Sequence, residues 1–166
     1  MINNISLKVD LDGVLVDFEG ALRERFGMNM REHRNKVWGK IAYYNDNVEP
    51  WFYSLPKMAD ADVLWTFVTE NFSDIEILSA CGTTPRDAAG QKKAWIGDHL
   101  GYDVRATIVK SGSEKALHAS PTALLIDDRA KVIAPFVDAG GMGILHTSAE
   151  DTIITLERLI ESEGWT

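Results

Sequence analysis

The sequence has very little cysteine, no excess of basic residues and no long apolar run. Its single cysteine, Cys81, excludes an internal disulfide, so we expect a reducing, cytoplasmic setting. Lys and Arg number 17 against 25 Asp and Glu, a net charge of -8 that argues against binding to a nucleic-acid backbone. No run approaches the roughly 18 apolar residues of a membrane span. The N-terminus, MINNISLKVD, lacks the basic start and apolar core of a signal peptide.

The chain has the composition of a folded protein and the pattern of an α/β sheet. Its 166 residues fit one ordinary domain with a small insertion, and 45% are hydrophobic. Short apolar runs alternate with mixed segments of helical spacing, which predicts a parallel sheet with right-handed crossovers. The predicted strands are residues 5–9, 75–80, 104–109, 122–127 and 142–146. The predicted helices are residues 18–27, 59–71, 84–101, 129–140 and 149–164, whereas the aromatic-rich stretch 28–56 shows no clean period.

Polar residues follow four of the predicted strands, at the sheet edge where function gathers in parallel sheets. They are Asp10 and Asp12 after the first strand, Ser79 at the end of the second, Lys110 after the third, and Asp127 and Asp128 at the end of the fourth. Four aspartates at one edge would raise one another's pKa values unless a cation lay among them. Because all these ligands are oxygens, a hard divalent ion such as Mg²⁺ suits them.

This combination supports phosphoryl chemistry. An aspartate beside Mg²⁺ is a reasonable nucleophile for phosphorus, and a second carboxylic acid two residues on can serve as general acid and then general base. A lysine and a small hydroxyl would stabilise the transferring charge. The alternative is a purely structural role for both pairs, an ordinary turn at Asp12-Gly13 and a helix cap at Asp127-Asp128. Both pairs at the ends of separate parallel strands favour a site.

These residues also carry a resemblance to a known family. DLDGVLVDF resembles the first motif of the haloacid dehalogenase (HAD) superfamily, ILSA its second and LLIDD its fourth. VDFEGALRERFG, EPWFYSLPKMADADVLWTF, KKAWIGDHLG and ALLIDDR look like one branch, the 5'(3')-deoxyribonucleotidases, over most of residues 5–130. The resemblance implies a Rossmann-like doubly wound parallel sheet, the HAD fold, formed by residues 1–17 and 72–166. A small helical cap, residues 18–71, would be inserted after the first strand.

The resemblance assigns roles to the polar residues. Asp10 would be the nucleophile and a Mg²⁺ ligand, and Asp12 the general acid/base with its backbone carbonyl on the metal. Asp127 and Asp128 would complete the metal site. Ser79 would bind the phosphoryl group through its hydroxyl.

The third motif of the family is a lysine, and two residues compete for this role. Lys115 is favoured because it precedes the fourth strand as the lysine of the family does, and Lys110 is the alternative because it directly follows the third strand. Ala80, an expected substrate-binding position, stands where the branch has a second hydroxyl, so this contact is missing or is supplied by Thr83 and Thr84. This departure leaves phosphate positioning and sugar preference open.

Further substrate contacts are implied by the branch. Phe18 occupies the place of an aromatic that packs against the base, and Trp51 and Phe52 align with aromatics of the branch. Lys92 sits where the branch has a phosphate-contacting lysine. The alternatives are that the aromatics fill the small core of the cap and that Lys92 is a solvated helix lysine.

The leading interpretation is a Mg²⁺-dependent phosphomonoesterase, a 5'-nucleotidase of the deoxyribonucleotidase kind, that works through an aspartyl-phosphate. The alternatives are a HAD phosphatase for a sugar or cofactor phosphate and a non-enzymatic phospho-acceptor domain. We expect a small phosphate monoester as partner, with no nucleic-acid polymer and no membrane, while a homodimer stays open.

Overall fold

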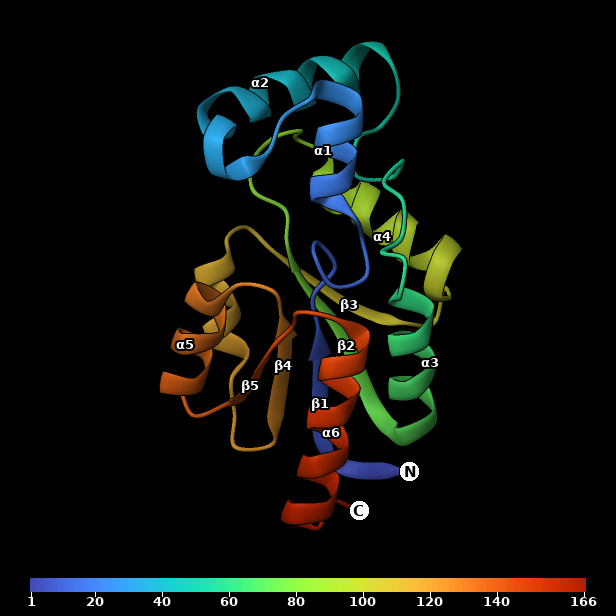
Figure 1. Ribbon diagram of the computed structural model, residues 1–166, viewed down its shortest axis with the longest axis vertical. Coiled ribbons are helices and arrows are strands. Elements are labelled where there is room, and N and C mark those ends of the chain that lie inside the picture. The colour runs from blue at the N-terminus through green and yellow to red at the C-terminus, as the bar shows by residue number, and fades with distance from the viewer.

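Five parallel strands form one sheet in the order β3-β2-β1-β4-β5 in the computed structural model, which describes residues 1–166 (Figure 1). The strands are β1 Ile2–Val9, β2 Phe72–Ala80, β3 Arg105–Val109, β4 Ala123–Asp127 and β5 Met142–Leu145. From β1 at the centre, the chain winds first toward β3 and then back past β1 toward β5. This confirms the predicted doubly wound α/β fold. It also makes the carboxyl ends of β1 and β4 the topological switch point, where ligands bind in such sheets.

Six α-helices and one short 3-10 helix connect the strands. They are α1 Phe18–Phe26, α2 Met30–Asn47, α3 Ala61–Asn71, α4 Ala88–Leu100, η1 Gly112–His118, α5 Ala130–Asp138 and α6 Ala149–Glu163. All five predicted helices are present, with bounds that differ by a few residues. No helix combines the length and the apolarity needed to cross a membrane.

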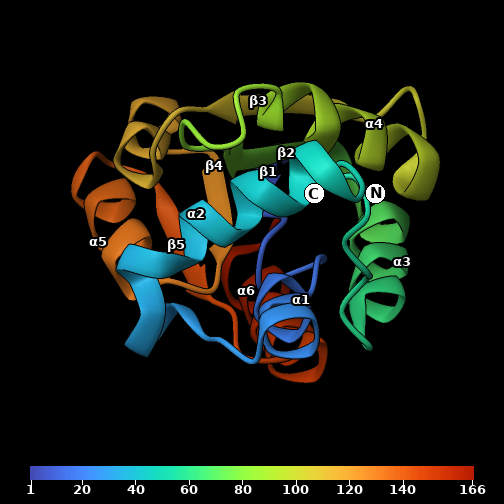
Figure 2. The same cartoon turned by 90° about the horizontal axis from the view of Figure 1, so that it is seen from above.

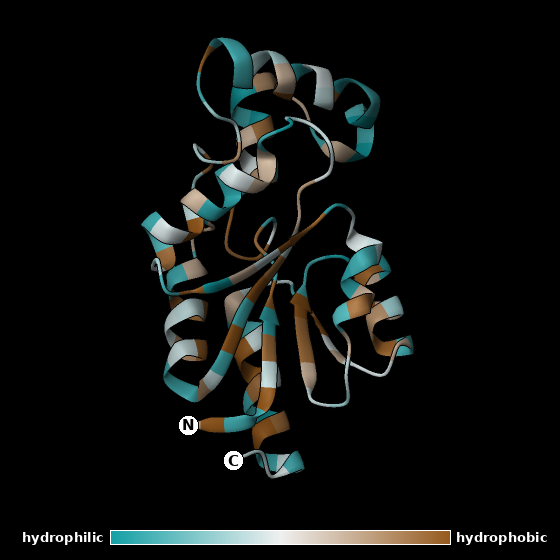
Figure 3. Cartoon of the chain, turned by 180° about the vertical axis from the view of Figure 1, so that it is seen from behind, coloured by the Kyte–Doolittle hydropathy of each residue, from teal (hydrophilic) through white to brown (hydrophobic).

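The 18-residue helix α2 lies in the stretch that showed no clean period. Only Val37 and Ile41 of α2 are buried, so its apolar stripe is too narrow to produce a helical pattern. Its start is well defined, because the Asn29 side chain accepts a hydrogen bond from the backbone N–H of Glu32 at 2.8 Å. In Figure 3 the sheet is largely brown, whereas α2 above it is mostly hydrophilic in colour.

The core lies on both faces of the sheet, because successive residues of a strand point to opposite sides. On β4, Leu124 and Ile126 belong to the larger cluster, which includes Leu64 of α3 and Leu156 of α6. Leu125, between them, joins Phe136 of α5 in a smaller cluster on the other face. All six side chains are fully buried. The carboxyl ends of the strands are therefore anchored by tightly packed residues on both faces of the sheet.

Helices α1 and α2 lie above the carboxyl ends of the strands, whereas α3 lies beside the sheet with α6 (Figures 1 and 2). The expected cap region, residues 18–71, is thus divided: α1 and α2 cover the sheet edge, and α3 joins the core because its apolar face packs on β2. Two adjacent segments connect the α1–α2 unit to the sheet. The backbone N–H of Asp17 donates to Pro56 at 2.9 Å, and that of Met58 donates to Leu15 at 2.9 Å.

Replacing Leu64 by alanine should lower the free energy of unfolding by about 2–5 kcal/mol, because a fully buried side chain would leave a cavity. Val63, its neighbour on α3, is 60% exposed, so Val63→Ala should change stability by no more than about 0.5 kcal/mol. Urea denaturation of the two variants tests the placement of α3. Equal losses in both would contradict it.

Candidate active site

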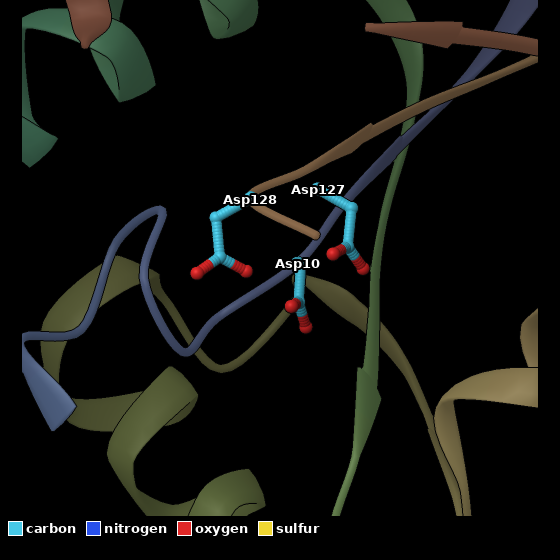
Figure 4. Close-up of side chains that lie close together, drawn as sticks. All are labelled: Asp10, Asp127 and Asp128. Carbon is cyan, nitrogen blue, oxygen red and sulfur yellow. The ribbon is translucent and has the colours of Figure 1, made fainter. Parts of the chain in front are cut away.

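Three carboxylates converge at the switch point of the sheet. Asp10 directly follows β1 and extends its pairing with β4, since its backbone N–H donates to Ile126 at 3.0 Å. Asp127 is the last residue of β4, and Asp128 follows it. Figure 4 shows the carboxylates of Asp10, Asp127 and Asp128 close together, and an oxygen from each lies within 4.8 Å of the others. The sheet topology therefore brings together residues more than a hundred positions apart.

Lys115 lies between two of these carboxylates. Its Nζ is 2.8 Å from Asp10 Oδ1 and 2.6 Å from Asp127 Oδ2, and its side chain is fully buried. It comes from η1, the turn that precedes β4. Lys110, the other candidate, is exposed, and its Nζ has no carboxylate within 4.0 Å. Of the two lysines, the structure places Lys115 at the carboxylates.

The cluster holds more negative charge than Lys115 neutralises. Burial alone would raise the pKa of Asp10, but the charges of Lys115 and Lys92 hold it below its usual value. Burial and the neighbouring Asp10 raise the pKa of Asp127. Burial of the carboxyl group, and then the charges of Asp10 and Asp127, raise the pKa of Asp128 to about 7. Asp10 is thus the ionised carboxylate of the group, and the excess charge favours a bound cation.

A tight turn after β1 positions Asp12. The backbone N–H groups of Val14, Leu15 and Val16 all donate to the carbonyl of Leu11, at 2.8 to 3.0 Å, which closes the turn. Gly13 has a φ of +81°, and a Cβ there would lie 2.1 Å from Asp128 Oδ2. Only glycine fits this position, because any side chain would meet the carboxylate.

Lys92 of α4 donates hydrogen bonds to both Asp12 and Ser79. Its Nζ donates to Asp12 Oδ2 at 2.5 Å and to Ser79 Oγ at 3.0 Å, and it lies 4.7 Å from the centre of the Phe52 ring. Lys92 and Ser79 are both buried, so the alternative of a solvated helix lysine is excluded. Lys92 is 2% exposed and Ser79 is fully enclosed, so both stand behind the carboxylates and outside the open cavity.

A cavity of about 590 Å³ opens between the sheet edge and the α1–α2 unit. Its floor carries Asp10, Asp12 and Asp128, together with Ala80. Its remaining lining includes aromatic rings on one part and cationic side chains on another. The cavity therefore joins the carboxylate cluster to a space large enough for a small organic molecule.

The aromatic wall is built by Phe18, Trp38 and Phe52. The rings of Phe18 and Phe52 are stacked with centres 6.1 Å apart, and Trp38 lies 6.2 Å from Phe18. The backbone N–H of Phe52 donates to Gln91 Oε1 at 2.8 Å, which fixes this wall to α4. Phe18 and Phe52 thus lie where a planar group could stack.

Trp51 corrects a prediction. Its side chain is fully buried, stacked on Phe26 at 5.3 Å and in edge contact with Tyr44, and it does not line the cavity. It cannot contact a substrate in this arrangement. It fills the small core of the α1–α2 unit, whereas Phe52, the next residue, lines the cavity.

Several cavity residues were not predicted. Arg31 and Arg34 lie on the same side of α2 as Trp38, at helical spacing. The spacing of these residues in the sequence indicates a shared face, but only once the segment is recognised as a helix. Arg129 and Lys131, at the beginning of α5, complete the cationic part of the lining together with Lys110.

Comparisons with known proteins bear on the fold. No protein-family model matches the sequence, and no curated protein is similar to it. A HAD-superfamily hydrolase from Ehrlichia chaffeensis is similar in structure, with a TM-score of 0.53 and 13% identity over 93% of this chain and 97% of that one. The chain has the HAD fold.

Two further solved structures share this fold. A hydrolase from Streptococcus pneumoniae TIGR4 has a TM-score of 0.53 and 15% identity over 92% of this chain and 97% of that one. A hydrolase from Pseudomonas syringae has a TM-score of 0.53 and 15% identity over 93% of this chain and 99% of that one. At such identities the likeness is one of fold, so the chemistry must be argued from the side chains.

The position of Lys115 gives a stability prediction. Lys115→Met should lower the free energy of unfolding by about 3–5 kcal/mol, because Asp10 and Asp127 would face each other with no buried cation. Lys110→Met, on an exposed residue, should change it by no more than about 0.5 kcal/mol. Urea denaturation with EDTA present measures both.

A second variant separates repulsion from lost packing. Adding Asp10→Asn to Lys115→Met removes one of the two facing charges, so it should restore part of the lost stability. A double variant that is less stable than Lys115→Met would contradict the electrostatic explanation.

Proposed function

We propose that the chain is a Mg²⁺-dependent phosphomonoesterase, and that its substrates are nucleotides, in the manner of a 5'-nucleotidase of the deoxyribonucleotidase kind. The observation that carries the proposal is the convergence of Asp10, Asp127 and Asp128, with Lys115 between the first two, at a cavity that Asp10 and Asp128 line together with an aromatic wall. The HAD fold places this cluster at the switch point.

The donor set fits Mg²⁺. Asp10, Asp127 and Asp128 offer only carboxylate oxygens, the ligands that hard divalent ions prefer. Burial and then the neighbouring carboxylate charge raise the pKa values of Asp127 and Asp128, and a bound cation would offset that charge. These three side chains would hold the ion, with the backbone carbonyl of Asp12 implied by the family resemblance. A bound Mg²⁺ supplies neutralisation of the phosphoryl charge.

Asp10 is the proposed nucleophile. Its lowered pKa keeps the carboxylate ionised, and Lys115 holds its Oδ1, which fixes the orientation of the group. A carboxylate oxygen of Asp10 bonds to phosphorus while the ester P–O bond breaks. The leaving oxygen takes a proton, and an aspartyl-phosphate remains.

Asp12 is the proposed general acid and base. Its side chain is 29% exposed and faces the cavity, so it can reach the leaving oxygen, while Lys92 fixes its position. The Asp12 carboxylic acid gives its proton to the leaving oxygen. As a carboxylate it then takes a proton from the water that attacks phosphorus, which breaks the Asp10–phosphorus bond and releases phosphate.

The aromatic wall supports a nucleotide over the alternative of a sugar or cofactor phosphate. Phe18, Trp38 and Phe52 present ring surface to the cavity, and a nucleobase is a planar partner for such rings. A non-enzymatic phospho-acceptor has no use for a substrate cavity of this kind.

A phosphatase panel of deoxyribonucleoside, ribonucleoside and sugar monophosphates tests the proposal. Asp12→Asn should lower the turnover number by about 10²–10⁴-fold, because the leaving oxygen and the attacking water lose their acid and base. Asp10→Asn should abolish turnover. Asp62→Asn is the control, since Asp62 is an exposed aspartate on α3. Turnover of sugar phosphates with none of nucleotides would contradict the nucleotide assignment.

Metal binding has a readout that does not depend on activity. Mg²⁺ at about 100 times its dissociation constant should raise the free energy of unfolding by about 2.7 kcal/mol relative to EDTA. Asp128→Asn should remove most of this gain, whereas Asp138→Asn, on the exposed end of α5, should keep it. Equal gains in both variants would place the metal elsewhere.

A further inference from the structure

The cavity has a cationic side that the proposed chemistry does not use. Arg31 and Arg34 come from the first turns of α2, Lys110 follows β3, and Arg129 and Lys131 lie at the start of α5. In Figure 1 the beginning of α2 lies above the side of the sheet that carries α5. These five cations gather at one cavity of a chain whose net charge is -8.

Four of the five have no acidic partner. No carboxylate oxygen lies within 4.0 Å of the side-chain nitrogens of Arg31, Arg34, Lys110 or Lys131. Only Arg129 approaches one, at 3.8 Å from Asp127 Oδ1.

The acidic cavity residue that contacts the start of α2 is already engaged. Glu19 also lines the cavity, but its carboxylate accepts from the backbone N–H of Met30 at 3.3 and 3.4 Å, at the start of α2. It therefore neutralises the helix terminus, and Arg31 and Arg34 remain free to meet a charge from outside.

The transferred phosphoryl group does not need these residues. Lys115 contacts Asp10 and Lys92 contacts Asp12, and a bound Mg²⁺ would add positive charge at the same carboxylates. Resting on the proposed phosphatase function, we propose that the leaving group of the substrate carries a second anionic group, a phosphate or a carboxylate, which Arg31 and Arg34 bind.

The residue types fit this role. The planar fork of an arginine matches the oxygens of phosphate and carboxylate with two parallel hydrogen bonds. Trp38 follows Arg34 by one helical turn and lines the same cavity, so a stacked ring and an anion would be held side by side. A nucleoside bisphosphate satisfies both contacts, and a sugar bisphosphate satisfies the anionic one.

The test compares substrates that differ by one phosphate. Initial rates of phosphate release are measured for thymidine 5'-monophosphate against thymidine 3',5'-bisphosphate, and for glucose 6-phosphate against glucose 1,6-bisphosphate. In at least one pair the doubly charged substrate should have a kcat/KM about tenfold higher, more than the factor of about two from having two phosphates, because charge-assisted hydrogen bonds are gained. p-Nitrophenyl phosphate, which has no second anion, reports whether the chain is a phosphatase at all.

Paired variants locate the effect. Arg31→Gln/Arg34→Gln should bring the ratio of the two kcat/KM values toward one. Lys36→Gln/Lys40→Gln removes the same charge from exposed positions of α2 outside the cavity and should keep the ratio. In an Asp10→Asn background, calorimetric affinities for the mono- and bisphosphate should show the same loss of preference in the arginine variant alone.

The outcomes separate the two proposals. Equal or better hydrolysis of the monophosphate in both pairs overturns the second-anion proposal and leaves the phosphatase function in place. An equal loss of preference in the lysine variant also overturns it, because net charge would then explain the effect. No phosphate release from any substrate, p-nitrophenyl phosphate included, overturns the phosphatase function and with it this inference.

Discussion

The buried ammonium group of Lys115, held between the carboxylates of Asp10 and Asp127, is the interaction on which the site depends. It joins the ends of β1 and β4, the two strands from which the chain winds in opposite directions. Apolar residues of similar volume often stabilise a core as well as a buried ion pair does, so stability alone does not explain this arrangement. Its effect is to keep the Asp10 carboxylate charged and oriented although it is buried, which solvent could not do there.

The sheet and its carboxylates were predictable because both depend on local pattern and topology. Apolar runs identify the strands, and parallel strands bring Asp10 and Asp127 to one edge of the sheet, independently of the conformation of the loops. The choice between Lys110 and Lys115 was not a matter of spacing. The η1 turn decides it, because it buries Lys115 and leaves Lys110 on the surface.

The α1–α2 unit was harder to predict because its burial is slight. With two buried residues in α2 there is little period to detect, so the arginines of α2 could not be placed. The aromatics of this unit do two things that composition does not distinguish. Trp51 fills its core, whereas Phe52, the next residue, faces the cavity.

Charge is distributed so that the cavity differs in sign from the whole chain. An overall charge of -8 repels polyanions, while unpaired cations that line a concave site focus a positive field on small anions that can enter. Helix α4 connects the aromatic wall to Asp12: Gln91 holds the backbone of Phe52, and the next residue, Lys92, holds the Asp12 carboxylate. In the proposed mechanism, the wall that would receive the leaving group and the acid that would protonate it are therefore fixed by one turn of one helix, so a displacement of either would displace the other.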